Sequence, residues 1–170
     1  MAPRFYVEPL SGGHDRSKFI SGSEPLDRYL RYQASQDVRR HIATCFVAVD
    51  LESQETAGYY TLSATSIPLE GLSPDVVRKL PRYPIVPAAL LGRLAVATSH
   101  QGEGLGPALL ADAIMRIARA ELGIFAIVVD AKDAEATRFY ERHGLRLLAD
   151  EAHRLCLPMA TALRALEGSR

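Results

Sequence analysis

The sequence contains no tryptophan, only two cysteines and no net charge. Its 170 residues are 48% hydrophobic and 24% charged, and 20 basic side chains balance 20 acidic ones, so the composition is typical of a globular protein. No apolar run approaches the length of a membrane span, and the first ten residues, MAPRFYVEPL, lack the apolar core of a signal peptide. We therefore expect a cytoplasmic protein with no membrane partner, folded as a single domain over residues 1–170.

The two cysteines, Cys45 and Cys156, are isolated from each other and lie in apolar segments. Free cysteines in such settings are usually buried packing residues, and a disulfide or a nucleophile is the alternative. The five histidines are scattered, and no Cys/His spacing is typical of a metal site. The sequence therefore predicts no metal.

Acidic residues are missing from the segment 76–102. The basic residues of this segment are Arg78, Lys79, Arg82 and Arg93, and a second basic group in the first predicted helix includes Arg39 and Arg40. Such segregation of charge can give a neutral protein one basic face. A solvated surface with chance clustering is the alternative, and both remain open at this point.

Hydrophobic periodicity and turn residues divide the chain into alternating strands and helices. Strands are predicted at residues 4–10, 44–50, 56–64, 88–97, 124–130, 145–148 and 154–157, and helices at 24–40, 73–80, 104–122 and 134–143. Because Pro81, Pro84 and Pro87 restrict the backbone, residues 80–87 are predicted to form an extended, stiff loop. Ser23 and Asp133 are candidate helix caps, and Gly144 is a candidate stop.

The strongest functional signal lies in residues 90–114, where an apolar strand is followed by the turn QGEGLG (Gln101–Gly106) and a long helix. The three glycines let the backbone pass close to a ligand, and the start of the helix adds its positive dipole end. These features predict an anion site suited to a pyrophosphate. No Gly-Lys-Ser/Thr follows the turn, and the G-x-G-x-G spacing differs from the dinucleotide fingerprint, so both of those nucleotide-binding motifs are absent.

The pattern Gln-x-x-Gly-x-Gly between a strand and a helix resembles the acetyl-CoA signature of the GNAT acetyltransferases. The order of the predicted elements also matches the GNAT fold over nearly the whole chain. The segments GYYTLSA, KLPRYPIVPAALLGRLAV, QGEGLG, VDAKD and FYERHGL together resemble the GNAT toxins of bacterial toxin–antitoxin pairs, which acetylate the amino group of aminoacyl-tRNA. The resemblance implies an α/β fold with a mixed, mostly antiparallel sheet of about six to seven strands flanked by helices.

The resemblance implies acetyl-CoA as the acetyl donor. Its pantetheine amides would pair with the backbone of the fourth strand, and the backbone amides of the turn would hold its pyrophosphate. The expected cofactor-binding residues are Leu94, Ala95, Val96, Gln101, Gly102, Glu103, Gly104, Leu105, Gly106 and Phe139, although Leu94 to Val96 could also be core strand and Phe139 a core aromatic.

Tyr140 is the expected catalytic residue. In GNAT enzymes the amine attacks the thioester directly, and the resemblance places the general-acid tyrosine in the helix after the fifth strand, where Tyr140 lies. A phenol with a pKa of about 10 can donate to the charge that develops on a thiol with a pKa of about 8.5. A core aromatic is the alternative interpretation of Tyr140.

The expected acceptor is the α-amino group of aminoacyl-tRNA, whose acetylation blocks translation. Segment 76–102 supplies no general base, and an α-amine with a pKa of about 7.7–8.0 is far less protonated at neutral pH than a lysine amine at about 10.4. A water chain, Glu103 or a distant carboxylate could also serve as the base. The residues expected to contact tRNA phosphates are Arg78, Lys79, Arg82, Arg93, Arg39 and Arg40. Arg93 could instead face the acceptor or the cofactor, or form a structural ion pair.

The resemblance also implies a homodimer and a small DNA-binding antitoxin as partner. Two other functions remain open from the residues. One is a GNAT enzyme that acetylates a small-molecule amine or a protein N-terminus, with activity insensitive to RNA. The other is a non-catalytic acyl-CoA-binding regulatory module, which would leave Tyr140 without a role in turnover.

Overall fold

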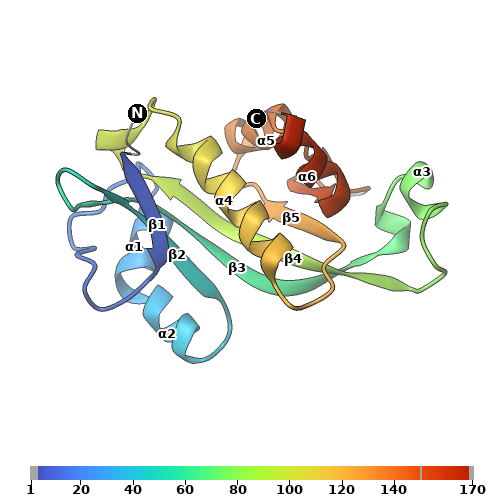
Figure 1. The fold of residues 1–170 in the computed structure, drawn as a ribbon, viewed down its shortest axis with the longest axis horizontal. Helices are drawn as coiled ribbons and strands as arrows, with labels where there is room; N and C mark the ends of the chain where they lie inside the picture. Colours follow the sequence, from blue (N-terminus) through green and yellow to red (C-terminus); the bar gives the residue numbers. More distant parts are fainter. Residues whose placement is uncertain (1–3, 150, 169–170) are drawn as a thin grey trace. The chain divides into compact units, whose positions relative to one another are not determined.

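The protein is described here by a computed structural model, which covers residues 4–149 and 151–168. The strands in these residues form one sheet with the order β1-β2-β3-β4-β5-β7-β6. Strands β1 to β5 and the α-helices are labelled in Figure 1. The strands are β1 (Phe5–Pro9), β2 (Thr44–Asp50), β3 (Thr56–Pro68), β4 (Ile85–Val96), β5 (Ala126–Asp130), β6 (Arg146–Leu147) and β7 (Arg154–Pro158). The α-helices are α1 (Glu24–Tyr32), α2 (Ala34–Arg39), α3 (Pro74–Val77), α4 (Leu105–Arg119), α5 (Ala134–Arg142) and α6 (Met159–Gly168). Two 3₁₀ helices are η1 (Leu69–Gly71) and η2 (Thr98–His100).

The chain divides into two compact units. Unit 1 contains the residues up to Ser63 together with Gly92–Ala113, and unit 2 contains Ala64–Leu91 and the residues from Ile114 on. Strands β3 and β4 each contribute residues to both units. No helix within the described residues is both long and apolar enough to cross a membrane.

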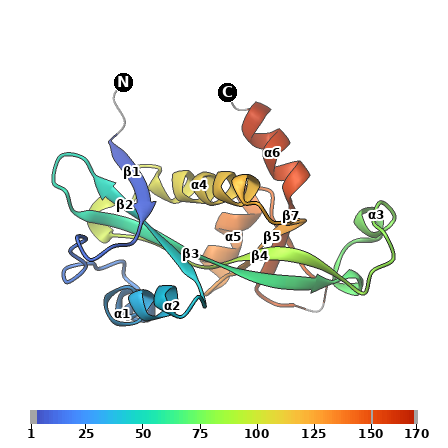
Figure 2. The same ribbon diagram turned by 60° about the horizontal axis from the view of Figure 1, so that its bottom comes forward.

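In unit 1 the sheet has a helix layer on each face, as Figure 2 shows for α1 and α2 on one side and α4 on the other. Strands β2 and β3 pair antiparallel, with Val47 opposite Tyr59 and Phe46 opposite Tyr60. Because side chains alternate along a strand, Val47 and Tyr59 join the core beneath α1. The Tyr60 hydroxyl points to the other face and donates to Asp112 Oδ2 of α4. This alternation confirms the strand pair that the sequence predicts.

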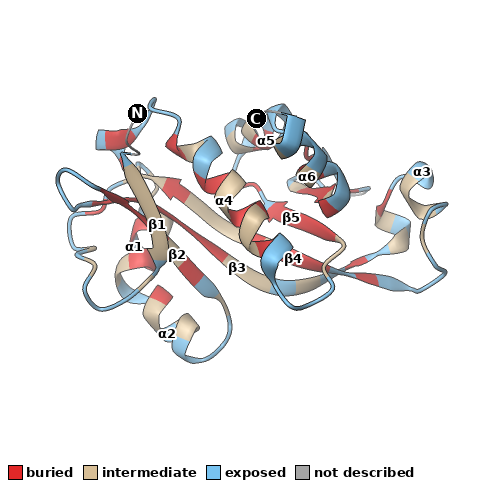
Figure 3. Cartoon of the chain, viewed as in Figure 1, coloured by how far each residue is buried: buried red, intermediate tan, exposed pale blue. Residues whose placement is uncertain are grey.

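In unit 2, β5 is the most deeply buried strand, as Figure 3 shows in red. Its residues from Ala126 to Val129 are at most 1% exposed, in agreement with a strand covered on both faces. It runs parallel to the first part of β4 and antiparallel to β7. The α/β class and the mixed, mostly antiparallel sheet are thereby confirmed.

The helix predicted at 24–40 is wrong as a continuous element, because the chain breaks at Gln33 into α1 and α2. Gln33 has φ −122° and ψ −32°, and its N–H still donates to the Tyr29 carbonyl. The apolar residues spaced four apart nevertheless all contact one core: Leu30 and Ala34 are fully buried, and Leu26 and Val38 pack against them. Periodicity therefore identified the buried face, although it could not locate the break.

Two further differences concern the start of β4 and a helix at the end of the described residues. The loop predicted at 80–87 is wrong from Ile85 on, because β4 begins there and includes Pro87. Proline lacks an N–H, yet the Pro87 carbonyl accepts a hydrogen bond from the Phe125 N–H, so the strand keeps this interaction. Helix α6 was not predicted, although it buries Met159 and Ala162 at helical spacing.

Candidate functional site

The glycine-rich turn lies in unit 1, between η2 and the start of α4. Gly102 and Gly104 have φ values of +80° and +82°, a conformation that L side chains rarely adopt. The N–H groups in the first turn of a helix have no partner within that helix, so those of Leu105 and Gly106 are available to an anion. The sequence thus forms the backbone geometry on which a pyrophosphate site depends.

Gln101 holds the turn in place through its side chain rather than its backbone. Its Nε2 donates to the carbonyls of Ser21, at 2.9 Å, and Val96, at 3.0 Å. The first bond ties the turn to the loop before α1, and the second ties it to the end of β4. Gln101 is therefore an anchor of the predicted cofactor turn.

The last residues of β4, Leu94 to Val96, lie against β3 at a point of unusually close approach. A Cβ added at Gly58 would lie 2.9 Å from the Ala95 carbonyl oxygen and 3.0 Å from the Leu109 side chain of α4. Only glycine fits between the strand and the helix at this position. The sequence analysis missed Gly58, because nothing in its local pattern shows what packs above it.

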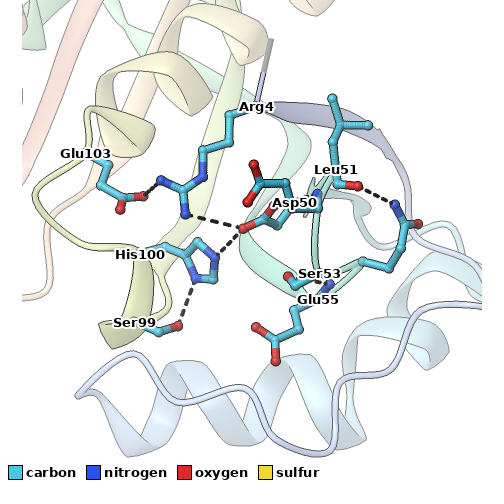
Figure 4. Close-up of polar contacts among 10 residues, drawn as sticks. Arg4, Asp50, Leu51, Ser53, Glu55, Ser99, His100 and Glu103 are labelled. Atoms are coloured by element: carbon cyan, nitrogen blue, oxygen red, sulfur yellow. Dashed lines mark hydrogen bonds and ion pairs between the residues drawn. The ribbon is translucent and has the colours of Figure 1, made fainter. Parts of the chain in front are cut away.

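A polar network beside the turn was also missed (Figure 4). His100 is buried, and its Nε2 donates to Asp50 Oδ2 at 2.9 Å, while Ser99 Oγ lies 2.8 Å from its Nδ1. Arg4 bridges two carboxylates, with Nη2 3.5 Å from Asp50 Oδ2 and Nη1 2.9 Å from Glu103 Oε2. The network connects Arg4, just before β1, and Asp50 of β2 with η2 and the turn, which lie far from both residues in the sequence, so there was no local signal.

Asp50 makes the stability of this network dependent on pH. The hydrogen bond from His100, with further bonds from backbone N–H groups, lowers the pKa of Asp50 to about 2. The unfolded carboxyl has a pKa of about 3.9, so the stabilisation is present above pH ~4 and is lost as the pH falls towards 2.

We expect Asp50→Asn to be less stable than wild type at neutral pH. The difference in free energy of unfolding between the two proteins should shrink as the pH falls from about 4 to about 2. Urea unfolding at a series of pH values measures this difference. A gap that stays constant across this interval would contradict the assigned role of the carboxylate.

Arg93 packs inside unit 1. Its guanidinium carbon lies 3.6 Å from the centroid of the Tyr29 ring, a cation–π contact. The Tyr29 hydroxyl in turn donates to Asp37 Oδ2 at 2.8 Å. Neither of the two roles weighed for Arg93, a ligand contact or an ion pair, accounts for this stacking. A contact of Arg93 with tRNA stays a prediction.

Tyr140 lies in unit 2, on α5, where it is 6% exposed. Burial raises the pKa of its phenol above the ordinary value, so the hydroxyl stays protonated at neutral pH. Phe139 packs edge-on against the Tyr140 ring, with the ring centroids 5.1 Å apart. The helix itself is fixed by Asp133, whose Oδ1 accepts from the Ala136 N–H at 2.8 Å, which confirms the predicted cap. Gly144, at φ +93°, follows the helix as predicted.

The basic residues predicted to contact tRNA come from both units. Arg78, Lys79 and Arg82 are exposed on the segment between α3 and β4 of unit 2, and Arg78 pairs with Asp75. Arg39 and Arg40 are exposed at the end of α2, in unit 1. The structure therefore leaves all five side chains accessible to a ligand.

The cysteines have no catalytic environment. Cys45 and Cys156 are free and buried, which confirms the first interpretation of both. Burial raises the pKa of Cys45 to about 12 and that of Cys156 to about 11, so neither forms a thiolate at neutral pH. Within residues 4–149 and 151–168, no group of three or more His, Cys, Asp or Glu side chains could hold a metal ion.

Known proteins are similar to this chain in fold and in sequence. The family model for the acetyltransferase (GNAT) domain matches residues 41–146. A protein of Mycobacterium tuberculosis (strain ATCC 25618 / H37Rv) named tRNA-acetylating toxin is 36% identical over 161 residues, which cover 94% of each chain. The solved structure of AtaT complexed with acetyl-methionyl-tRNAfMet is 27% identical, covers 96% of this chain and 99% of its own, and has a TM-score of 0.87. A structure of AtaTR bound with AcCoA is 26% identical, covers 96% and 98%, and has a TM-score of 0.82.

The mixed sheet, with a strand, a glycine-rich turn and a long helix in succession, defines an α/β protein with a candidate anion site. The chain belongs to the GNAT acetyltransferase family, whose model matches more than half of it. It is therefore an acetyltransferase.

Proposed function

We infer that this enzyme acetylates the α-amino group of aminoacyl-tRNA and thereby blocks translation. One observation carries this inference: over 94% of its length the chain is 36% identical to a protein named tRNA-acetylating toxin. The complex of AtaT with acetyl-methionyl-tRNAfMet, at a TM-score of 0.87, supports the same substrate class.

Acetyl-CoA is bound by the backbone of the turn and of β4. The N–H groups of Gly102 to Gly106 hold the pyrophosphate, and Leu94, Ala95 and Val96 pair with the pantetheine amides. The left-handed glycines and the anchored Gln101 support this assignment. Phe139, half-buried on α5, is the remaining cofactor contact.

Tyr140 acts as the general acid. The acceptor nitrogen attacks the thioester carbonyl carbon, the C–S bond breaks, and the phenol donates its proton to the departing sulfur. The position of Tyr140 on α5, in the helix after the fifth strand, supports this role, because the resemblance places the general acid there and a phenol is protonated at neutral pH. The amine loses its proton to solvent, and the Tyr140 phenolate takes a proton back from solvent, so that the products are the amide and the thiol of CoA.

The acceptor is an α-amine rather than a lysine side chain. Segment 76–102 carries no carboxylate, and Glu103, which was one candidate base, is ion-paired with Arg4. An α-amine depends less on a general base than a lysine amine does, since its pKa is about 7.7–8.0 and much of it is already deprotonated at neutral pH.

The tRNA is held by the exposed basic residues Arg78, Lys79 and Arg82 and by Arg39 and Arg40, with Arg93 as a further candidate. Contacts of this kind position the phosphates and weaken with salt. A small DNA-binding antitoxin that covers the basic surface, a homodimer and a location in the cytoplasm complete the proposal, and a solved KacTA–DNA complex with 26% identity and a TM-score of 0.79 supports the first of these.

Transfer of label from radiolabelled acetyl-CoA tests the substrate. The acceptors are a pool of charged tRNA, deacylated tRNA, free amino acids and peptides. We expect label on charged tRNA only, released with the amino acid when the ester is hydrolysed. Label on free amines or peptides, insensitive to RNA, would keep the enzyme class and overturn the substrate. Binding of acetyl-CoA without any transfer would favour a regulatory module.

A further inference from the structure

We propose that Arg4 makes the glycine turn competent for acetyl-CoA by neutralising Glu103, and that the Asp50–His100 pair holds Arg4 and the turn in register. This inference rests on the proposed function, because it takes the turn Gln101–Gly106 as the pyrophosphate site. It assigns a positioning role to residues outside that turn.

Glu103 presents a difficulty for an anion site. Its carboxylate belongs to the same short turn whose N–H groups face the ligand, and its side chain is 35% exposed. A carboxylate within several ångströms of a pyrophosphate is repelled by it, and partial burial weakens the solvent screening. The negative charge must therefore be compensated for the turn to bind an anion well.

Arg4 provides that compensation. Its Nη1 lies 2.9 Å from Glu103 Oε2, while its Nη2 lies 3.5 Å from Asp50 Oδ2 (Figure 4). A guanidinium can reach two carboxylates at once with separate nitrogens, which the single nitrogen of a lysine does much less well. The pairing also directs the Glu103 carboxylate towards β1.

The position of Arg4 is set by both its backbone and its surroundings. Its carbonyl accepts from the Leu51 N–H at 2.9 Å, and its guanidinium carbon lies 5.2 Å from the centroid of the Phe5 ring. That ring meets His100 edge-on at 5.8 Å. Since His100 directly precedes Gln101 and is bonded to Asp50, these contacts tie the start of β1 to the base of the turn.

The test compares acetyl-CoA binding by calorimetry in wild type, Arg4→Gln, Glu103→Gln and the double variant. We expect Arg4→Gln to weaken binding about tenfold, and the effect to shrink at 0.5 M salt. Adding Glu103→Gln should restore most of the lost affinity, because the uncompensated carboxylate is then gone. Arg4→Lys keeps the positive charge but cannot contact both carboxylates at once. Its affinity for acetyl-CoA should therefore lie between those of wild type and Arg4→Gln.

Steady-state kinetics separates this role from a general structural one. Arg4→Gln should raise KM for acetyl-CoA with kcat little changed, and should leave KM for acetyl-pantetheine, which lacks the phosphates, at the wild-type value. Arg119→Gln, which removes an exposed charge at the end of α4, is the matched control.

Three results would overturn the inference: unchanged binding in Arg4→Gln, failure of Glu103→Gln to rescue it, or an equal loss with acetyl-pantetheine. Failure of rescue would mean that Arg4 contacts the phosphates itself. A different result would overturn the turn site itself: Gly104→Val binding acetyl-CoA as wild type does. The present inference would then fail with it. The substrate proposal fails only in the transfer assay with charged tRNA.

Discussion

Replacing Tyr140 by phenylalanine is expected to lower kcat by about 10²- to 10³-fold, within the usual range for loss of a general acid. The ring that packs against Phe139 remains, and only the hydroxyl is removed. The affinity for acetyl-CoA should therefore stay within about threefold of wild type, since a small change is expected when no binding contact is lost. Single-turnover transfer to charged tRNA, with calorimetry for binding, measures the two effects separately.

Tyr32→Phe is the matched control for this variant. The Tyr32 side chain is 70% exposed on α1, so the same chemical change there should leave turnover unaltered. The pH dependence of kcat adds a second criterion. Ionisation of Tyr140 should not lower kcat until well above neutral pH, because burial raises the pKa of its phenol. A Tyr140→Phe enzyme with wild-type kcat would show that the tyrosine is a core aromatic only.

Replacing Gly58 by valine is expected to destabilise unit 1 more than any other single glycine substitution in it. The new Cβ would lie 2.9 Å from the Ala95 backbone oxygen, so the strand itself would have to move. Overpacking of this kind costs about 3 kcal/mol, which for a chain of this size lowers Tm by about 10 °C. Because Ala95 lies in the segment proposed to pair with pantetheine, KM for acetyl-CoA should rise as well.

Gly12→Val is the control for the glycine substitution. A Cβ at Gly12 meets nothing within 4 Å. The free energy of unfolding, measured by thermal unfolding, should therefore change by no more than about 0.5 kcal/mol. If Gly58→Val unfolds at the wild-type temperature, then β3, β4 and α4 are not packed as closely as the structure describes.

Local patterns were sufficient where neighbours in the sequence also determine the structure. The cap at Asp133 and the stop at Gly144 depend on neighbours within a few residues, and both were predicted correctly. The buried face of the first helix followed from apolar residues spaced four apart, because that spacing places them on one side of a helix. The break at Gln33 did not follow, because no proline or glycine marks it in the sequence.

Sequence motifs identified the glycine-rich turn as a candidate site, but not the residues that support it. Asp50 and His100 are fifty positions apart in the sequence. Arg4 and Glu103, which form an ion pair, are ninety-nine positions apart. The spacing of such residues carries no information until strand pairing brings them together. The same holds for Arg93, whose contact with Tyr29 differs from both roles that its sequence position suggested.

The amino-acid sequence by itself determined the order of the strands, the position of the glycine-rich turn and the family. These depend on periodicity, on the backbone freedom of glycine and on motifs read in order. Only the tertiary structure decided which charges compensate each other and where a side chain larger than hydrogen cannot fit. Hydrogen bonds and steric contacts act over a few ångströms, so they become defined only when β1, β2, β3 and α4 are packed together.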